Sequence, residues 1–98
     1  MLDQVIRVLR APAESCFFWA THAGAELDLL IVRGRRRLGF EFKRTDAPRL
    51  TASMRSALES LKLDRLDVVH AGTRTFRLTS RVRAVAASHI TRELKPMR

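Results

Sequence analysis

Two short segments that alternate apolar and polar residues, with a glycine between them, constrain the fold of this 98-residue chain most. They are residues 25–32 and residues 36–44. Alternate residues of a strand share one face, and the apolar faces are made by Leu27, Leu29 and Ile31, and by Leu38, Phe40 and Phe42. Gly34-Arg35 suits a two-residue turn with glycine at its first central position. The two segments are therefore predicted to form an antiparallel hairpin.

The predicted hairpin brings four charged residues together. If Gly34 and Arg35 form the loop, Asp28 lies opposite Glu41, and Glu26 lies opposite Lys43. All four side chains then share one face, and directly opposite Cβ atoms lie about 5 Å apart. A three-residue loop would shift the register and separate these pairs.

Facing carboxylates repel each other, so this arrangement needs a cation. Mg²⁺ or Mn²⁺ would suit it, because Mg²⁺ takes one or two carboxylates, keeps several waters and accepts phosphate oxygens. Lys43 lies two residues beyond Glu41 and would stabilise the negative charge that develops on an attacked phosphate. The pattern predicts Asp28 and Glu41 as metal ligands and Lys43 as a catalytic residue. The alternative is a cross-strand ion pair between Glu26 and Lys43, with solvated acids at a sheet edge.

The charge balance favours an anionic partner. The net charge is +9 and the sequence pI is about 11.5, which suits nucleic acid, an acidic protein or an acidic membrane surface. Arginine bias from a GC-rich genome is the alternative. The candidates to contact a nucleic-acid backbone are Arg33, Arg35, Arg36, Arg37 and Arg44. The alternative is that the arginines of residues 33–37 only keep an exposed hairpin tip in solution through their charge.

The single cysteine excludes an internal disulfide and suits a reducing cytoplasm. Cys16 and the aromatic residues after it, Phe17, Phe18 and Trp19, are predicted to lie in the core rather than to form a base-stacking platform. No apolar run approaches the roughly 20 residues of a membrane span. No signal-peptide core is expected either, since charged residues interrupt the N-terminal segment.

The rest of the chain predicts one α/β (α+β) domain over residues 1–98, with its core at about 15–85. The order is an N-terminal helix (1–12), a three-stranded antiparallel meander that begins with residues 15–21, a crossover helix (51–62) capped by Thr51, and a strand (66–71). Further short strands (75–78 and 82–85), a helical turn (88–94) and a frayed tail (95–98) complete it. A helix between two strands favours a parallel crossover.

The segments Phe-Trp-Ala-Thr-His-Ala-Gly-Ala-Glu-Leu-Asp-Leu-Leu (18–30) and Gly-Phe-Glu-Phe-Lys-Arg (39–44) resemble the C-terminal domain, of unknown function, of a large prokaryotic family of AAA+ ATPases. The resemblance covers about residues 15–85. That domain is similar to PD-(D/E)XK nucleases, which implies a restriction-endonuclease-like core. By this resemblance Asp28 and Glu41 correspond to the metal-binding acids, Lys43 to the catalytic lysine and Glu26 to a further acid.

The chain departs from the family pattern in three ways. Leu27 stands where the proline of the name would be, and only Asp3 or Glu14 could supply an acid from the first helix. The ATPase half and its phosphate-binding loop are missing, so no ATP site is expected. The expected function is nucleic-acid binding with metal-dependent phosphodiester cleavage, in a fragment or remnant of an ATPase-associated protein. The alternative is an inactive protein-interaction or dimerisation domain, and a homodimer fits both.

Overall fold

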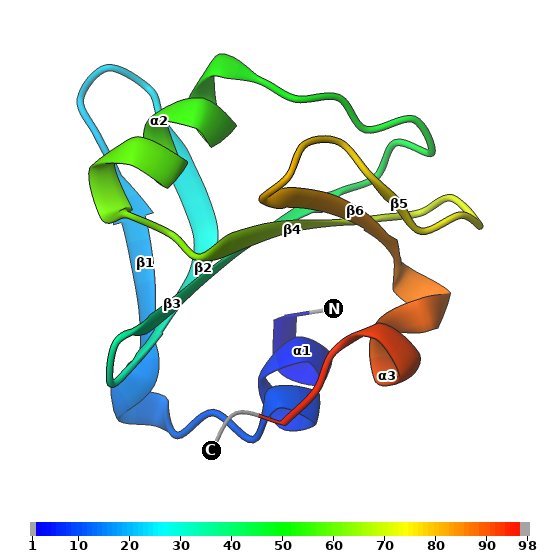
Figure 1. The fold of residues 1–98 in the computed structure, drawn as a ribbon, viewed down its shortest axis with the longest axis horizontal. Helices are drawn as coiled ribbons and strands as arrows, with labels where there is room; N and C mark the ends of the chain where they lie inside the picture. Colours follow the sequence, from blue (N-terminus) through cyan, green and yellow to red (C-terminus); the bar gives the residue numbers. More distant parts are fainter. Residues whose placement is uncertain (1, 97–98) are drawn as a thin grey trace.

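A computed structural model describes residues 2–96. Its elements, in chain order, are α1 (Leu2–Leu9), η1 (Ala13–Ser15), β1 (Cys16–Ala20), β2 (Glu26–Arg33), β3 (Arg36–Lys43), α2 (Ala52–Leu61), β4 (Arg65–His70), β5 (Phe76–Arg77), β6 (Val82–Ala86), η2 (Ala87–His89) and α3 (Ile90–Glu93). The strands form one mixed sheet in the order β1-β2-β3-β4-β6-β5. α2 covers one face, and α1 and α3 lie together on the other (Figure 1). The predicted α+β architecture is confirmed.

The predicted hairpin register is confirmed from Arg33–Arg36 to Leu29–Phe40, where β2 and β3 pair antiparallel. Gly34 has a φ of 61°, a left-handed conformation that glycine adopts without steric cost. Turns with positive φ at this position match the twist of the flanking strands. The glycine therefore fixes the loop length, and the loop length fixes which residues face each other.

The crossover is also confirmed, since β3 and β4 pair in parallel and α2 connects them. Thr51 caps α2 as predicted, because its Oγ1 accepts a hydrogen bond from the Met54 N–H at 3.2 Å. The segment after α2 packs closely on the sheet at Gly39. A Cβ there would lie 2.7 Å from Leu63 Cδ1, so a larger residue would force the Leu63 side chain to move.

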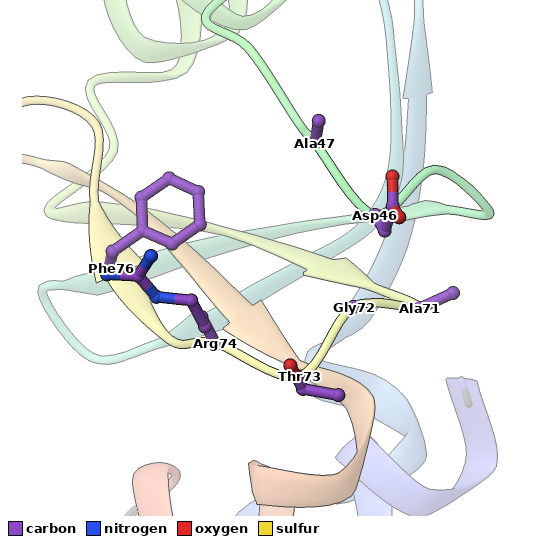
Figure 2. Close-up of a pocket in the computed structure, with 7 residues that line it drawn as sticks. All are labelled: Asp46, Ala47, Ala71, Gly72, Thr73, Arg74 and Phe76. Carbon is purple, nitrogen blue, oxygen red and sulfur yellow. The ribbon is translucent and has the colours of Figure 1, made fainter.

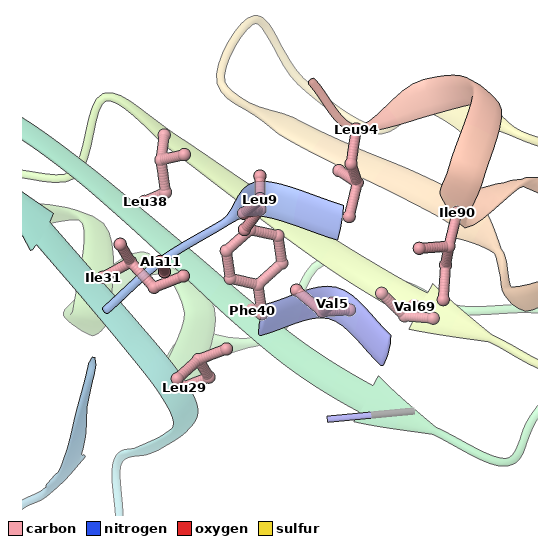
Figure 3. Packing of buried hydrophobic residues seen from close by; sticks show 10 residues of the cluster. All are labelled: Val5, Leu9, Ala11, Leu29, Ile31, Leu38, Phe40, Val69, Ile90 and Leu94. Carbon is pink, nitrogen blue, oxygen red and sulfur yellow. The ribbon is translucent and has the colours of Figure 1, made fainter. Parts of the chain in front are cut away.

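Two apolar cores lie on the two faces of the sheet. The core beneath α1 and α3 surrounds Phe40, and its buried residues are Val5, Leu9, Ala11, Leu29, Ile31, Leu38, Phe40, Val69, Ile90 and Leu94 (Figure 3). The core beneath α2 contains Leu27, Leu30, Met54, Ala57, Leu58, Leu63, Leu66, Val68 and Val82. Burial of these side chains is the main driving force that holds the helices on the sheet.

The predicted alternation along β2 is wrong at one point. Leu27 packs in the α2 core with Leu30, not on the face of Leu29 and Ile31. The cause is an irregularity in the β1–β2 pairing, where Phe17 faces Leu30 but Trp19 faces Leu27. An extra residue in one strand of a pair reverses the side that the following side chains face. Asp28 lies within this irregular segment.

The prediction that the aromatic residues of β1 are core residues is wrong for two of them. Phe17 is 49% exposed and Phe18 is 71% exposed, whereas Trp19 packs partly buried against the α2 core. Cys16, predicted to be a buried core thiol, is only partly buried. The reason is position: β1 pairs only with β2, so it is an edge strand and the helices cover little of it.

A buried ion pair that the sequence reading did not identify joins β4, β6 and α3. Asp67 is fully buried, and the Arg83 guanidinium donates to both of its carboxylate oxygens, at 3.2 and 3.1 Å. Arg83 also pairs with Glu93 of α3 at 3.2 Å, and Arg65 Nε lies 3.3 Å from Asp67. A bidentate contact of this kind holds the carboxylate strongly.

No helix within residues 2–96 has the length and apolar character needed to cross a bilayer. The predicted frayed tail (95–98) falls partly outside the described residues, as does Met1 of the predicted N-terminal helix.

Replacing Arg83 with Leu should lower the free energy of unfolding by about 3 kcal/mol, because it leaves a buried carboxylate without its main partner. Arg92→Leu is the matched control, since Arg92 is 66% exposed and pairs with Glu93 at the surface. The control should cost under about 1 kcal/mol. Denaturant unfolding of both variants checks the prediction, and equal losses would contradict it.

Candidate functional site

The site lies where the β2–β3 hairpin opens. The ladder ends at Leu29–Phe40, and immediately beyond it the Phe42 N–H donates to Asp28 Oδ2 at 2.8 Å. The Asp28 side chain thus takes a main-chain donor of β3 that would otherwise continue the ladder. This contact fixes the Asp28 carboxylate beside β3, at the residue that directly follows Glu41 in that strand. Neither predicted pair, Asp28 with Glu41 or Glu26 with Lys43, belongs to the ladder, and the reversal at Leu27 removes the alternation that was expected to put Glu26 on the face of Glu41.

Glu41 is the most unusual residue of the group. It is only 5% exposed, and its Oε2 is buried without a hydrogen-bond partner among the described residues. Burial raises the pKa of its carboxyl; the Lys43 charge lowers it, and the Asp28 and Glu26 charges raise it. The charges of Lys43, Asp28 and Glu26 thus all act on the Glu41 carboxyl. A buried unpaired carboxylate oxygen is costly, so it calls for an explanation.

Glu26 is positioned by a residue that sequence reasoning did not assign to the site. The Glu26 N–H donates to Ser53 Oγ at 3.1 Å, and the Ser53 hydroxyl donates back to the Glu26 carbonyl oxygen at 3.3 Å. Ser53 stands in the first turn of α2, so this pair of bonds ties the start of β2 to the crossover helix. The sequence gives only a weak signal for this role. Ser53 is a serine in the first turn of a helix, and Thr51 already supplies the cap of that helix.

The N-terminal part of the chain was expected to supply any third acid for a cation. Within residues 2–96, no three His, Cys, Asp or Glu side chains are grouped closely enough to hold a metal ion. Asp3 belongs to α1, which packs on the face away from Glu41. The Glu14 charge acts on Cys16 instead. Burial is the larger cause that raises the pKa of the Cys16 thiol, and the Glu14 charge raises it further. Neither residue supplies an acid from the first helix.

The five arginines predicted to contact nucleic acid are not equivalent. Arg37 has structural contacts, since its guanidinium donates to the Leu61 carbonyl at 3.0 Å and its N–H donates to the Asp64 carboxylate at 2.8 Å. Arg35 and Arg36 are exposed at the hairpin turn, and Arg33 is partly buried. Glu41 lies five residues from Arg36 along β3, or about 17 Å at the rise of a strand. Arg44, exposed directly after Lys43, is the arginine nearest the acids in sequence.

His70, the neighbour of Lys43 in the parallel ladder, holds the chain that follows β4. Its Nδ1 accepts from the Gly72 N–H at 3.0 Å, and its Nε2 lies 2.8 Å from the Arg74 carbonyl. Because Nδ1 is an acceptor, the ring carries its proton on Nε2 and donates it to Arg74. With both nitrogens used and no exposed surface, His70 acts as a structural support for the loop.

The raised pKa of Glu41 predicts how stability varies with pH. The folded chain keeps the Glu41 carboxyl protonated over a pH range in which the unfolded chain has already lost that proton. The free energy of unfolding therefore falls as the pH rises through this range. The range begins near the ordinary glutamate pKa of about 4.5. Glu41→Gln should abolish this loss and raise the free energy of unfolding at pH 7.

Denaturant unfolding between pH 4 and pH 8 checks this prediction. Glu59→Gln is the control, because Glu59 is exposed on α2 and should leave the pH dependence unchanged. A Glu41→Gln chain that is less stable than the parent at pH 7 would contradict the assignment.

Comparison with known proteins places the chain in a family. The model of a domain of unknown function, DUF4143, matches residues 3–90. Uncharacterised proteins of Mycobacterium tuberculosis and Mycobacterium bovis are each 43% identical to the chain over 90 residues, which is 92% of this chain and 20% of each relative. The chain thus spans about a fifth of the length of these relatives. The comparison with solved structures gave no match. Since the family model matches nearly the whole chain, the chain belongs to the DUF4143 family.

Proposed function

We propose that this chain is a nucleic-acid-binding domain of the PD-(D/E)XK nuclease type, which cleaves phosphodiester bonds with the help of Mg²⁺ or Mn²⁺. One observation carries the proposal: within residues 2–96, Glu41 Oε2 is buried without a hydrogen-bond partner, and the Asp28 charge acts on the same carboxyl. Buried polar atoms without a partner are rare in folded proteins, and an ion is one of the explanations for them.

The donor set fits a hard divalent cation. Asp28 uses Oδ2 for the Phe42 amide, so Oδ1 and the buried Glu41 oxygen are the atoms that would hold the metal. Bound there, the metal would polarise a phosphoryl oxygen and lower the pKa of a bound water. Lys43 would place a positive charge beside the attacked phosphate. Glu41 has to be ionised to act as a ligand, and its raised pKa makes binding weaker at acid pH.

The order of elements supports the fold assignment. A helix, an antiparallel meander, a crossover helix and a parallel strand follow one another here, as in the PD-(D/E)XK core. The relatives are about five times longer than this chain, which leaves room for the ATPase domain that we propose as its neighbour. A cytoplasmic location is part of the same proposal.

The basic residues supply the nucleic-acid contacts in this proposal. Arg44 follows the catalytic lysine and would bind a phosphate beside the scissile one. Arg35 and Arg36 would contact the backbone further along, and Arg33 and Arg37 would add charge at the same end of the hairpin. Binding of this kind releases counterions, so affinity should fall steeply with added salt.

A cleavage assay tests the proposal. Plasmid, single-stranded and branched DNA are incubated with the chain and with Mg²⁺ or Mn²⁺. Asp28→Asn and Lys43→Ala should each lower the rate at least about 100-fold, because groups of this kind stabilise charge in the transition state. Asp64→Asn is the control, since this exposed acid lies at the hairpin's other end beside Arg37.

Metal binding is measured separately by thermal unfolding. Mn²⁺ should raise the melting temperature of the parent chain and of Lys43→Ala, but not that of Asp28→Asn. Cleavage that persists in both variants, or a melting temperature that Mn²⁺ leaves unchanged, would sink the proposal.

A second candidate function is protein interaction through the edge strand β1. Phe17 and Phe18 are exposed there, and β1 has an unpaired edge. Unpaired edges and exposed aromatic residues favour strand addition by another chain. In this alternative the domain is catalytically inactive and forms a homodimer through β1.

Sedimentation velocity over a range of concentrations tests the alternative. The parent chain should dimerise, and the double substitution Phe17→Ser and Phe18→Ser should shift it to the monomer. Leu2→Ser is the control, because Leu2 is a similarly exposed apolar residue on α1. A parent chain that stays monomeric at high concentration would contradict dimerisation.

A further inference from the structure

A cavity of about 550 Å³ opens between the loop that follows β3 and the segment that follows β4. Asp46 and Ala47 lie on one side of it, and Arg74 and Phe76 lie across from them (Figure 2). Ala71, Gly72 and Thr73 complete the lining. The volume is within the range of small-molecule sites. None of these residues was identified as functional from the sequence.

The cavity lies beyond the end of β3 that carries Lys43. Asp46 stands three residues beyond Lys43, which is about 10 Å of extended chain. The Ala71 N–H donates to the Thr45 carbonyl oxygen at 3.2 Å, and this bond holds the two walls together just past the Lys43–His70 pair.

A row of paired residues also links the two sites across the sheet. Glu41 pairs with Val68, Val68 with Ala84, and Ala84 with Phe76. Paired residues on adjacent strands share a face, so Phe76 lies on the same face as Glu41. Three strand spacings separate them, or about 14 Å.

The wall that carries Phe76 is held rigidly. The Phe76 ring packs against His70 at 6.0 Å between centroids, with the rings at 61°, which is the edge-to-face arrangement that aromatic pairs favour. The two His70 hydrogen bonds fix Gly72 and Arg74. Phe76 is still 37% exposed. A preformed site with an exposed aromatic ring is a surface on which a flat ligand can stack.

The lining chemistry matches one flat ligand class. The cavity combines an aromatic ring, the planar guanidinium of Arg74, small apolar residues and one carboxylate, that of Asp46. Unpaired bases are recognised by stacking on aromatic rings and arginine planes and by hydrogen bonds to their edges. A carboxylate only accepts hydrogen bonds, and the Watson–Crick edge of guanine offers it two adjacent donors, N1–H and the N2 amino group.

We infer that this cavity binds one unpaired nucleobase of a nucleic acid, guanine best, close to the phosphate that lies over Glu41 and Lys43. Phe76 and Arg74 stack on the base, and Asp46 accepts hydrogen bonds from its edge. The inference rests on the proposed function, because it names the part of the substrate that reaches this cavity.

Binding without metal tests the inference independently of cleavage. Short single-stranded DNA with one central guanine is titrated in EDTA and followed by fluorescence anisotropy. The same strand with an abasic position in place of guanine should bind about ten-fold more weakly, as stacking of a single base on an aromatic residue predicts. Strands with a central adenine, cytosine or thymine should fall between these two.

Substitutions identify the cavity as the binding site. Phe76→Leu keeps an apolar side chain without an aromatic face and should lose about ten-fold in affinity for the guanine strand, whereas Phe76→Trp should retain it. Leu2→Ala is the control, since Leu2 is an exposed apolar residue on α1, which packs on the other face of the sheet, and it should have no effect. Asp46→Asn should remove the preference for guanine over adenine.

The outcomes separate this inference from the proposed function. If the abasic strand binds as tightly as the guanine strand, or if Phe76→Leu and Leu2→Ala behave alike, the base site is wrong, whether or not the chain cleaves DNA. If the guanine preference depends on Phe76 and Asp46 but no metal supports cleavage, the base site stands and the nuclease proposal fails.

Discussion

The pairing of β2 with β3 is the interaction on which the rest of the structure depends. Its register is set by a glycine turn, and β3 then pairs in parallel with β4 beneath α2. The ladder ends one pair before Asp28 and Glu41. There the Asp28 side chain, rather than the main chain of β2, receives the Phe42 N–H. A continued ladder would have placed Asp28 directly opposite Glu41.

Burial distinguishes Glu41 from the other acids. It faces the α2 layer next to Val68, where water is largely excluded and the charged form is disfavoured. Asp67 is just as deeply buried, but it has a complete set of arginine partners on the opposite face. The contrast separates two reasons for burying an acid. Asp67 joins strands and a helix, whereas Glu41 keeps an oxygen without a hydrogen-bond partner within residues 2–96, which is why we propose Glu41 as a metal ligand.

Most of the fold could be predicted from patterns that act locally. The Gly34 turn, the Thr51 cap and the alternation of Leu38, Phe40 and Phe42 each depend on near neighbours in sequence, and each was confirmed. The errors concern position in the sheet. Phe17 and Phe18 are apolar enough for a core, but an edge strand leaves them exposed. The irregular segment at Asp28 could not be predicted either, because it depends on how β1 pairs with β2.

The sequence by itself determined the turn and the β2–β3 register as far as Leu29–Phe40, because a two-residue turn and the two-residue period of a strand are short-range geometry. Only the tertiary structure decided the environments of the four charged residues beyond that point. Glu41 is buried on the face of the sheet that it shares with Val68, Ser53 holds the Glu26 main chain in place, and the parallel pairing with β4 brings the Asp46 loop to the Phe76 segment. Each of these depends on contacts between residues far apart in the chain, and the free energy of such contacts comes from burial, which no local pattern specifies.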